Sequence, residues 1–223
     1  DKLISHKRHF LKPEWDGEKT LNGKKIMLWS EQGIGDTINW SSALSYISSK
    51  AQSCTLECQE KLVPLLKNSF PDIVVKPENK ILDAKKNDFD FHLPMGSLYK
   101  NFISEISQNT NVKPFLIPIP ERVNFWRKRL KSLGNGPYIG ISWKSSDMSH
   151  HRLQNYAPLK YWQSLFLIPN VTFLNLQYKD FESDLMSIQN DFGVTVHNFD
   201  DLDHYNNLLD LAAFFSALDC VVS

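Results

Sequence analysis

Glycine and cysteine are scarce in this sequence, and neither sign of charge is in excess. The 223 residues include 9 glycines and 3 cysteines, and the 25 Lys and Arg balance the 25 Asp and Glu. Few glycines with many aromatic residues are typical of a globular chain, not of a disordered one. Balanced charge leaves no basic footprint for nucleic acid or for an anionic membrane, so we expect neither as a partner.

Long apolar runs are also missing. No run is long enough to cross a bilayer as a helix, and no signal peptide is visible, although Asp1 need not be the natural start. The odd cysteine count indicates free, buried thiols in a reducing compartment, at Cys54, Cys58 and Cys220. The sequence therefore predicts a cytoplasmic protein that does not span a membrane.

Several signatures of common active sites are absent. There is no Gly-Lys-Ser/Thr phosphate loop, no complete dinucleotide fingerprint and no serine nucleophile elbow. Cys54 and Cys58 lack the second cysteine pair of a zinc site, and the histidines and aspartates near His204 lack ligand spacing. We therefore expect no metal and no cofactor.

The stretch from Trp29 to Thr37, WSEQGIGDT, is the most informative part of the sequence. It follows an apolar run and precedes apolar residues at helical spacing, which indicates a buried strand, a glycine turn and a helix start. Ligands bind at that place in open α/β sheets, and glycines there allow a tight turn and a close approach. Asp36 can cap the helix or face a ligand, and the pattern alone leaves both interpretations open.

Strand and helix patterns alternate through two similar halves, which favours mainly parallel sheets covered on both faces. The strands predicted in the first half are 25–30, 53–56, 73–75 and 88–93, with helices after Asp36 and at 60–68 and 97–106. In the second half we predict strands 138–143, 171–177, 194–196 and 219–222, with helices 121–133, 159–167, 181–192 and 208–217.

These patterns predict four segments. They are an N-terminal tail or linker (1–22), a first Rossmann-like domain (23–120), a connecting helix (121–136) and a second Rossmann-like domain (137–223). The last segment stops directly after a strand, where a parallel sheet normally continues with a crossover helix. We therefore expect the second domain to be truncated at its C-terminal end.

Motifs in both halves resemble those of a glycosyltransferase domain. The first half carries WDGE at 15–18, LNGK at 21–24 and EQGIGDTI at 31–38, and the second carries GISWKS at 140–145, NLQY at 175–178 and LDCVVS at 218–223. Together they resemble the domain that often follows tetratricopeptide repeats in bacterial proteins, which is similar to the lipopolysaccharide heptosyltransferases. The resemblance covers about Trp15 to Ser223.

The resemblance implies a GT-B fold, in which two Rossmann-like domains face each other across a cleft. It implies sugar transfer from a nucleotide-sugar donor to a hydroxyl of a glycan, lipid-linked or protein acceptor, without an essential metal. Asp36 matches the family's candidate catalytic base, which suits a reaction whose hydroxyl nucleophile is weak at neutral pH. The acceptor-side loop then comprises Gln32, Gly33, Gly35 and Thr37.

The nucleotide-sugar side falls in the second half, after two strands. Basic and hydroxyl side chains can stabilise the departing diphosphate, and strand-end residues can line the base pocket. The predicted nucleotide-sugar-binding residues are Ser142, Lys144, Ser145, Arg152, Gln177 and Tyr178. The family's further Asp-Thr and His-Leu-Ala-Gly stretches are missing here, so the donor site is expected to be incomplete.

Plainer interpretations stay open at this point. Lys144 and Arg152 can be solvated loop charges, Gln177 and Tyr178 a strand-end turn, and the tryptophans ordinary packing. The alternative function is a non-catalytic nucleotide-sugar or glycan binding module beside tetratricopeptide repeats. An ordinary nucleotide-binding α/β protein is a third interpretation, which the incomplete fingerprint disfavours.

Overall fold

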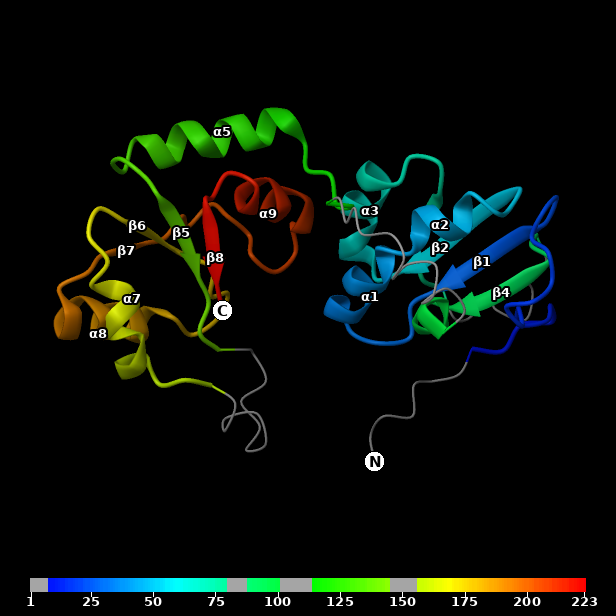
Figure 1. The fold of residues 1–223 in the computed structure, drawn as a ribbon, viewed down its shortest axis with the longest axis horizontal. Helices are drawn as coiled ribbons and strands as arrows, with labels where there is room; N and C mark the ends of the chain where they lie inside the picture. The colour runs from blue at the N-terminus through cyan, green and yellow to red at the C-terminus, as the bar shows by residue number, and fades with distance from the viewer. Residues whose placement is uncertain (1–7, 80–87, 101–113, 145–155) are drawn as a thin grey trace. The chain divides into compact units, whose positions relative to one another are not determined.

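The computed structural model describes residues 8–79, 88–100, 114–144 and 156–223. The chain divides into two compact units, Asp1–Ile117 and Pro118–Ser223. Each unit contains a four-stranded parallel sheet with helices (Figure 1), which agrees with the predicted α/β class. None of the described helices is long and apolar enough to cross a membrane.

The first unit is built on the strand that precedes the glycine turn. Its strands are β1 (Lys25–Trp29), β2 (Ser53–Cys58), β3 (Val74–Pro77) and β4 (Phe91–Pro94). Its helices are α1 (Ile34–Ser41), α2 (Leu44–Ser48), the 3-10 turn η1 (Glu60–Leu62) and α3 (Val63–Ser69). All three strand pairings are parallel, in the order β3-β2-β1-β4.

Alternation along β1 gives the sheet two apolar faces. Ile26 and Leu28 are almost fully buried, while Met27 and Trp29 join a second cluster with Phe89 and the N-terminal Phe10. A strand buried on both sides needs a continuous apolar run, and residues 26–29 supply it. That burial fixes the position of the turn that follows Trp29.

The second unit repeats the same plan. Its strands are β5 (Tyr138–Ile141), β6 (Thr172–Asn175), β7 (Val196–His197) and β8 (Cys220–Val222), in the order β7-β6-β5-β8. Its helices are α5 (Pro120–Lys131), α7 (Gln163–Phe166), α8 (Glu182–Phe192) and α9 (Leu208–Phe215), with the 3-10 turn η3 at Leu159–Trp162.

Helices cover both faces of the second sheet. In Figure 1, α5 and α9 lie over one side of the sheet and α7 and α8 lie over the other. Trp126 of α5 and Phe214 of α9 share a core with Leu174, whereas Phe166 and Ile188 share a core with Phe173. Because adjacent residues of β6 point to opposite faces, one strand contributes to both cores.

Local signals set several helix ends. Pro120 occupies the first turn of α5, where its missing N–H costs nothing, and three basic residues lie in the last turn. Gly193 ends α8 with φ 69, the left-handed conformation that favours glycine. The Asn207 side chain accepts from the Asp210 N–H at 3.2 Å and so caps α9.

The structure corrects three details. The helix predicted after Asp36 is two short helices, because the hydroxyls of Ser41 and Ser42 bond back to carbonyls three residues earlier at 2.6 and 2.8 Å. Strand β4 begins at Phe91, later than predicted. Cys220 is exposed, not buried.

The two other thiols are buried as expected. Burial raises the pKa of Cys54 and of Cys58 to about 12, and nearby carboxylates add to the effect at Cys58. Both thiols are therefore protonated and poor nucleophiles at neutral pH. Residues 96–100 are helical, and the remainder of the helix predicted at 97–106 lies outside the described residues.

Both sheets reverse direction at their first strand. The chain moves outward from β1 to β2 and β3, then returns to place β4 on the other side of β1, and β8 returns beside β5 in the same way. In open parallel sheets ligands bind at the carboxyl ends of the strands, beside such a reversal. The predicted site residues follow the ends of β1, β5 and β6.

Candidate functional site

The turn after β1 is closed by Asp36. Gly33 caps α1, and the Gly33 N–H donates to Asp36 Oδ2 at 3.1 Å. Asp36 is the third residue of the helix, so the prediction that it stands before the helix as an N-cap is corrected. Its carboxylate still stabilises the helix start, because it binds a backbone donor there. The Asp36 side chain is exposed, and its second oxygen stays available to a ligand.

Neither glycine of the turn is required by a left-handed backbone conformation. Gly33 has φ −69, and Gly35 lies in the first turn of α1, so neither uses the left-handed region. A Cβ at Gly33 would lie 3.3 Å from Asp36 Oδ2, whereas a Cβ at Gly35 would meet nothing within 4 Å. The turn therefore leaves open space beside Gly35.

Gln59 joins the turn to the end of β2. Its amide Nε2 donates to the Gln32 carbonyl at 2.8 Å. The buried Thr37 hydroxyl lies 3.1 Å from the Gly33 carbonyl and 3.2 Å from Gln59 Oε1, and either oxygen can accept its proton. Gln32 and Thr37 therefore hold the shape of the turn, and sequence reasoning missed Gln59, which lies 27 residues from Gln32.

Glu31 is a second carboxyl at the same edge, and sequence reasoning did not select it. The side chain is half-buried, and the Gly96 N–H, just after β4, donates to it. Burial raises the pKa of Glu31 to about 7, the Gly96 hydrogen bond opposes that rise, and the charge of Glu14 adds to it. A Cβ at Gly96 would lie 2.6 Å from Glu31 Oε1 and 3.1 Å from the Trp40 ring.

In the second unit, Gln177 organises the carboxyl edge. The residue is 1% exposed, and Oε1 accepts from the Ser142 hydroxyl and the Lys144 N–H, both at 3.2 Å. The Gln177 backbone N–H donates to Asn175 Oδ1 at 2.8 Å. The amide Nε2 is buried without a partner among the described residues. Gln177 therefore fixes the segment after β5 and keeps one unused donor.

Lys144 is engaged within its own unit. Its Nζ lies 2.6 Å from Asp184 Oδ2 and 2.7 Å from the Asp180 carbonyl, and Trp143 Nε1 donates to the same carboxylate oxygen at 2.8 Å. The ammonium is thus drawn toward the start of α8. A diphosphate would compete with Asp184 for this cation.

The other predicted residues fall in two groups. Tyr178 stacks on Tyr205 with ring centroids 5.9 Å apart, just beyond β6. Ser145 and Arg152, the remaining nucleotide-sugar candidates, lie outside the described residues. The structure thus brings Ser142, Lys144 and Gln177 together, and it places the Asp36 turn in the other unit.

His204 lies next to Gln177 and was considered from sequence only as a metal ligand. Burial lowers its pKa, and hydrogen bonds to the Gln177 and Leu176 carbonyls oppose that effect. Its Nδ1 is buried and lacks a partner within the described ranges. No three His, Cys, Asp or Glu residues of the described part gather as metal ligands. Asp201 and Asp203 bind Arg129 and nearby backbone donors instead.

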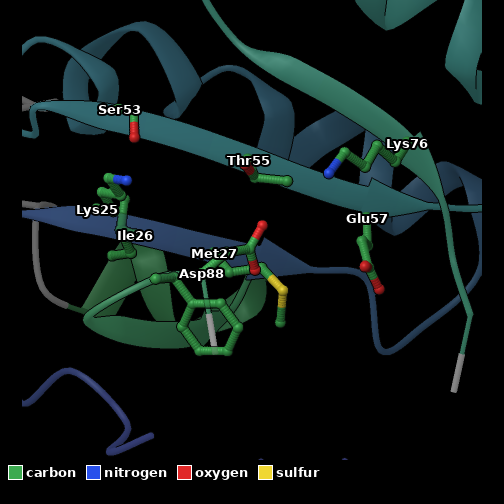
Figure 2. A pocket seen from close by; sticks show the side chains of 9 residues that line it. Lys25, Ile26, Met27, Ser53, Thr55, Glu57, Lys76 and Asp88 are labelled. Atoms are coloured by element: carbon green, nitrogen blue, oxygen red, sulfur yellow. The ribbon is translucent and has the colours of Figure 1, made fainter. Parts of the chain in front are cut away.

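Two hollows in the first unit lie away from these edges. Figure 2 shows one of about 100 Å³ over β1 and β2, with Lys25, Ser53, Thr55 and Glu57 on its wall. Glu57 is already paired with the buried Arg8 at 2.6 Å. A second hollow, of about 420 Å³, lies near the amino ends of β2 and β3 and is lined largely by serines and by residues 70–73. Neither is lined by a predicted site residue.

The chain is similar to a known protein in sequence and to a solved structure in fold. No family model matches the chain. Protein FlbA of Caulobacter vibrioides is 28% identical over 222 residues, a match that covers 93% of this chain and 37% of FlbA. The chain therefore spans little more than a third of that relative's length.

The crystal structure of the glycosyl transferase family 9 from Veillonella parvula DSM 2008 has a similar fold. The alignment covers 95% of this chain and 77% of that protein, with a TM-score of 0.59 and 12% sequence identity. At that identity the likeness concerns fold alone. The chain therefore shares the fold of a family 9 glycosyltransferase.

Proposed function

We propose that this chain is a glycosyltransferase domain that moves a sugar from a nucleotide-sugar to an acceptor hydroxyl. The observation that carries the proposal is a fold like that of a family 9 glycosyltransferase, with polar side chains gathered at the carboxyl edge of each sheet. In this proposal the first unit holds the acceptor and the second holds the donor. A cleft between two such domains is part of the proposal.

Asp36 is the proposed base. It would accept the proton of the acceptor hydroxyl while the hydroxyl oxygen bonds to the anomeric carbon and the nucleoside diphosphate leaves with the bonding electrons. Among the described residues it accepts one side-chain hydrogen bond, from the Gly33 N–H to Oδ2, which leaves the second oxygen for that proton. The open space beside Gly35 would admit the acceptor.

The donor side rests on Ser142, Lys144, Gln177 and Tyr178, with Ser145 and Arg152. The unused Gln177 Nε2 can donate to a ligand oxygen, and the Tyr178–Tyr205 pair offers an aromatic surface to a base. Lys144 can stabilise the developing negative charge if the diphosphate draws it from Asp184. No metal is required in this scheme.

The test is turnover of nucleotide-sugars by the full-length protein. We expect release of nucleoside diphosphate from one donor in a panel, and Asp36→Asn should lower that rate by at least about 100-fold because general-base catalysis is lost. Asp191→Asn, an exposed carboxylate on α8, is the matched control. In both variants, the melting temperature and the affinity for the donor should stay near those of the wild type. An undiminished rate in Asp36→Asn would rule out its role as the base.

A second candidate function is a non-catalytic nucleotide-sugar or glycan binding module. The engagement of Lys144 by Asp184 favours it, because that cation is then unavailable to a leaving diphosphate. Under this alternative a donor raises the melting temperature by mass action, but the full-length protein releases no diphosphate.

A further inference from the structure

The reversal point of the first sheet contains an acidic group with an unused oxygen. Glu31 lies two residues beyond β1, and Gly96, whose N–H donates to it, lies two residues beyond β4. Strands β1 and β4 are parallel neighbours with Trp29 opposite Pro94. The carboxyl is therefore fixed between the carboxyl ends of the two strands that flank the reversal, where open α/β sheets bind ligands.

Among the described residues, only one oxygen of the Glu31 carboxyl has a hydrogen-bond partner. Gly96 has no side chain, and a Cβ there would approach Glu31 Oε1 to 2.6 Å, so glycine provides the room that the carboxyl occupies. Oε2 is buried and has no hydrogen-bond partner among the described residues. Buried polar atoms rarely stay unpaired, so this oxygen calls for a partner from outside that part of the chain.

The surroundings indicate an uncharged partner. Burial and the charge of Glu14 both oppose ionisation of Glu31, and the Gly96 hydrogen bond only partly offsets them. An anion would be repelled by Glu14, whereas a hydroxyl adds no charge to a partly desolvated site. The Trp40 ring and the Glu31 carboxyl both pack against Gly96, since a Cβ there would lie 3.1 Å from the ring and 2.6 Å from Oε1. A carboxyl beside an aromatic ring suits the hydroxyls and the apolar face of a sugar.

From this juxtaposition we infer that Glu31 is a binding residue for a neutral acceptor sugar, whose hydroxyl pairs with Oε2 while the sugar ring lies against Trp40. The inference rests on the proposed function, since it identifies the acceptor class of the same unit. It also adds Glu31, Gly96 and Trp40 to the acceptor side. Asp36 keeps the role of base.

The test is a titration of the protein with neutral methyl pyranosides, followed by saturation-transfer NMR. We expect Glu31→Gln to bind nearly as well as wild type, because the amide can still donate. Glu31→Ala should bind roughly tenfold more weakly, the loss of one hydrogen bond to a partly buried group. Glu60→Ala, an exposed glutamate in η1, is the matched control and should bind normally.

The pH dependence gives a second readout that a structural role would not move. Binding removes more water from the carboxyl and so favours its neutral form. Wild-type affinity should therefore fall as pH rises through about 7, while Glu31→Gln stays constant. Glu14 is the charged neighbour that contributes to this titration, and Glu14→Gln should move the fall to lower pH.

Three results would overturn the inference. They are no pyranoside binding by the wild type, equal binding by wild type and Glu31→Ala, and equal loss in Glu31→Gln and Glu31→Ala with intact folds. The donor assay separates this failure from failure of the proposed function. Diphosphate release without pyranoside binding removes only the role of Glu31, and pyranoside binding without diphosphate release removes only transfer.

Discussion

At the scale of single residues, the fold does not require a glycine at position 35, whereas the proposed acceptor site does. It lies inside the first turn of α1 without a left-handed φ, and a Cβ there would contact nothing within 4 Å. The helix itself would accept alanine. What glycine provides at this position is empty space next to Asp36.

Gly35→Ala is therefore expected to stabilise the fold and impair its use. Alanine in a helix is more favourable than glycine by about 0.5–1 kcal/mol, so the melting temperature should rise slightly. Transfer should fall, because the methyl group fills the space proposed for the acceptor. Thermal unfolding and diphosphate release, measured on the same preparation, check both parts. Unchanged transfer would show that no ligand approaches Gly35.

Sequence reasoning located the turn after β1 but did not find the residues that contact it. The Gln-Gly-x-Gly-Asp pattern was enough to locate the turn after β1, because strand, glycine and helix signals are all local. The partners of the turn are not local. Gln59 and Gly96 come from the ends of β2 and β4, and only the sheet pairing brings them beside Gln32 and Glu31. The raised pKa of Glu31 follows from that burial, so no local motif indicates it.

At the scale of elements, a buried carboxylate joins α5 to α9. The Arg122 guanidinium donates to both oxygens of Asp210 at 2.7 and 2.8 Å, and Trp126 Nε1 donates to one of them at 3.0 Å. Burial alone would raise the pKa of Asp210, but the hydrogen bonds from Arg122 and Trp126 outweigh it and the pKa is lowered. The ion pair therefore stabilises the second unit most at pH values above the usual range of an aspartate.

Asp210→Ala should destabilise the second unit. The substitution leaves Arg122 and the buried Trp126 indole without their acceptor, and we expect a loss of about 2 kcal/mol in the free energy of unfolding. The difference in unfolding free energy between wild type and variant should shrink as pH falls below 4, because wild-type Asp210 then becomes protonated and loses its ion pair. Urea unfolding at neutral and acid pH measures this. Asp191→Ala, on the exposed side of α8, is the control.

Element positions were largely predictable because the periodic signals were strong. The α5 prediction was wrong by only one or two residues at each end, since Pro120 and the basic last turn mark its limits. The helix predicted after Asp36 was less accurate, because the serines near its middle offered side-chain bonds that compete with a continuous helix. Strand β4 began later than its alternating Asp-Phe pattern indicated.

At the scale of the whole molecule, the chain consists of two units, each with a sheet and a core of its own. The second unit has two apolar clusters, one on each face of its sheet, made entirely of residues after Pro118. A core that is complete within one segment supports independent folding.

Residues 118–223 are accordingly expected to fold without the first unit. The isolated segment should unfold cooperatively, and Trp126→Ala should lower its stability by about 3–5 kcal/mol, as loss of a fully buried aromatic side chain does. The test is to follow unfolding of this segment by near-ultraviolet circular dichroism. Phe215→Ala, which changes an exposed aromatic residue, is the control and should unfold like the unmodified segment. A segment that shows no cooperative transition would mean that its core depends on the first unit.

The strand order has a consequence for synthesis. Ile26 of β1 pairs with Cys54 on one side and with Phe91 on the other, so the ribosome delivers the two neighbours of β1 at different times. The nascent sheet first grows from β1 toward β2 and β3, and β4 pairs with the opposite side of β1 only afterwards. Glu31 receives its Gly96 partner at that last step, as the end of β5 gains β8 in the second unit. A chain interrupted before β4 can therefore retain a partial sheet and a helix layer while lacking one wall of the proposed acceptor site.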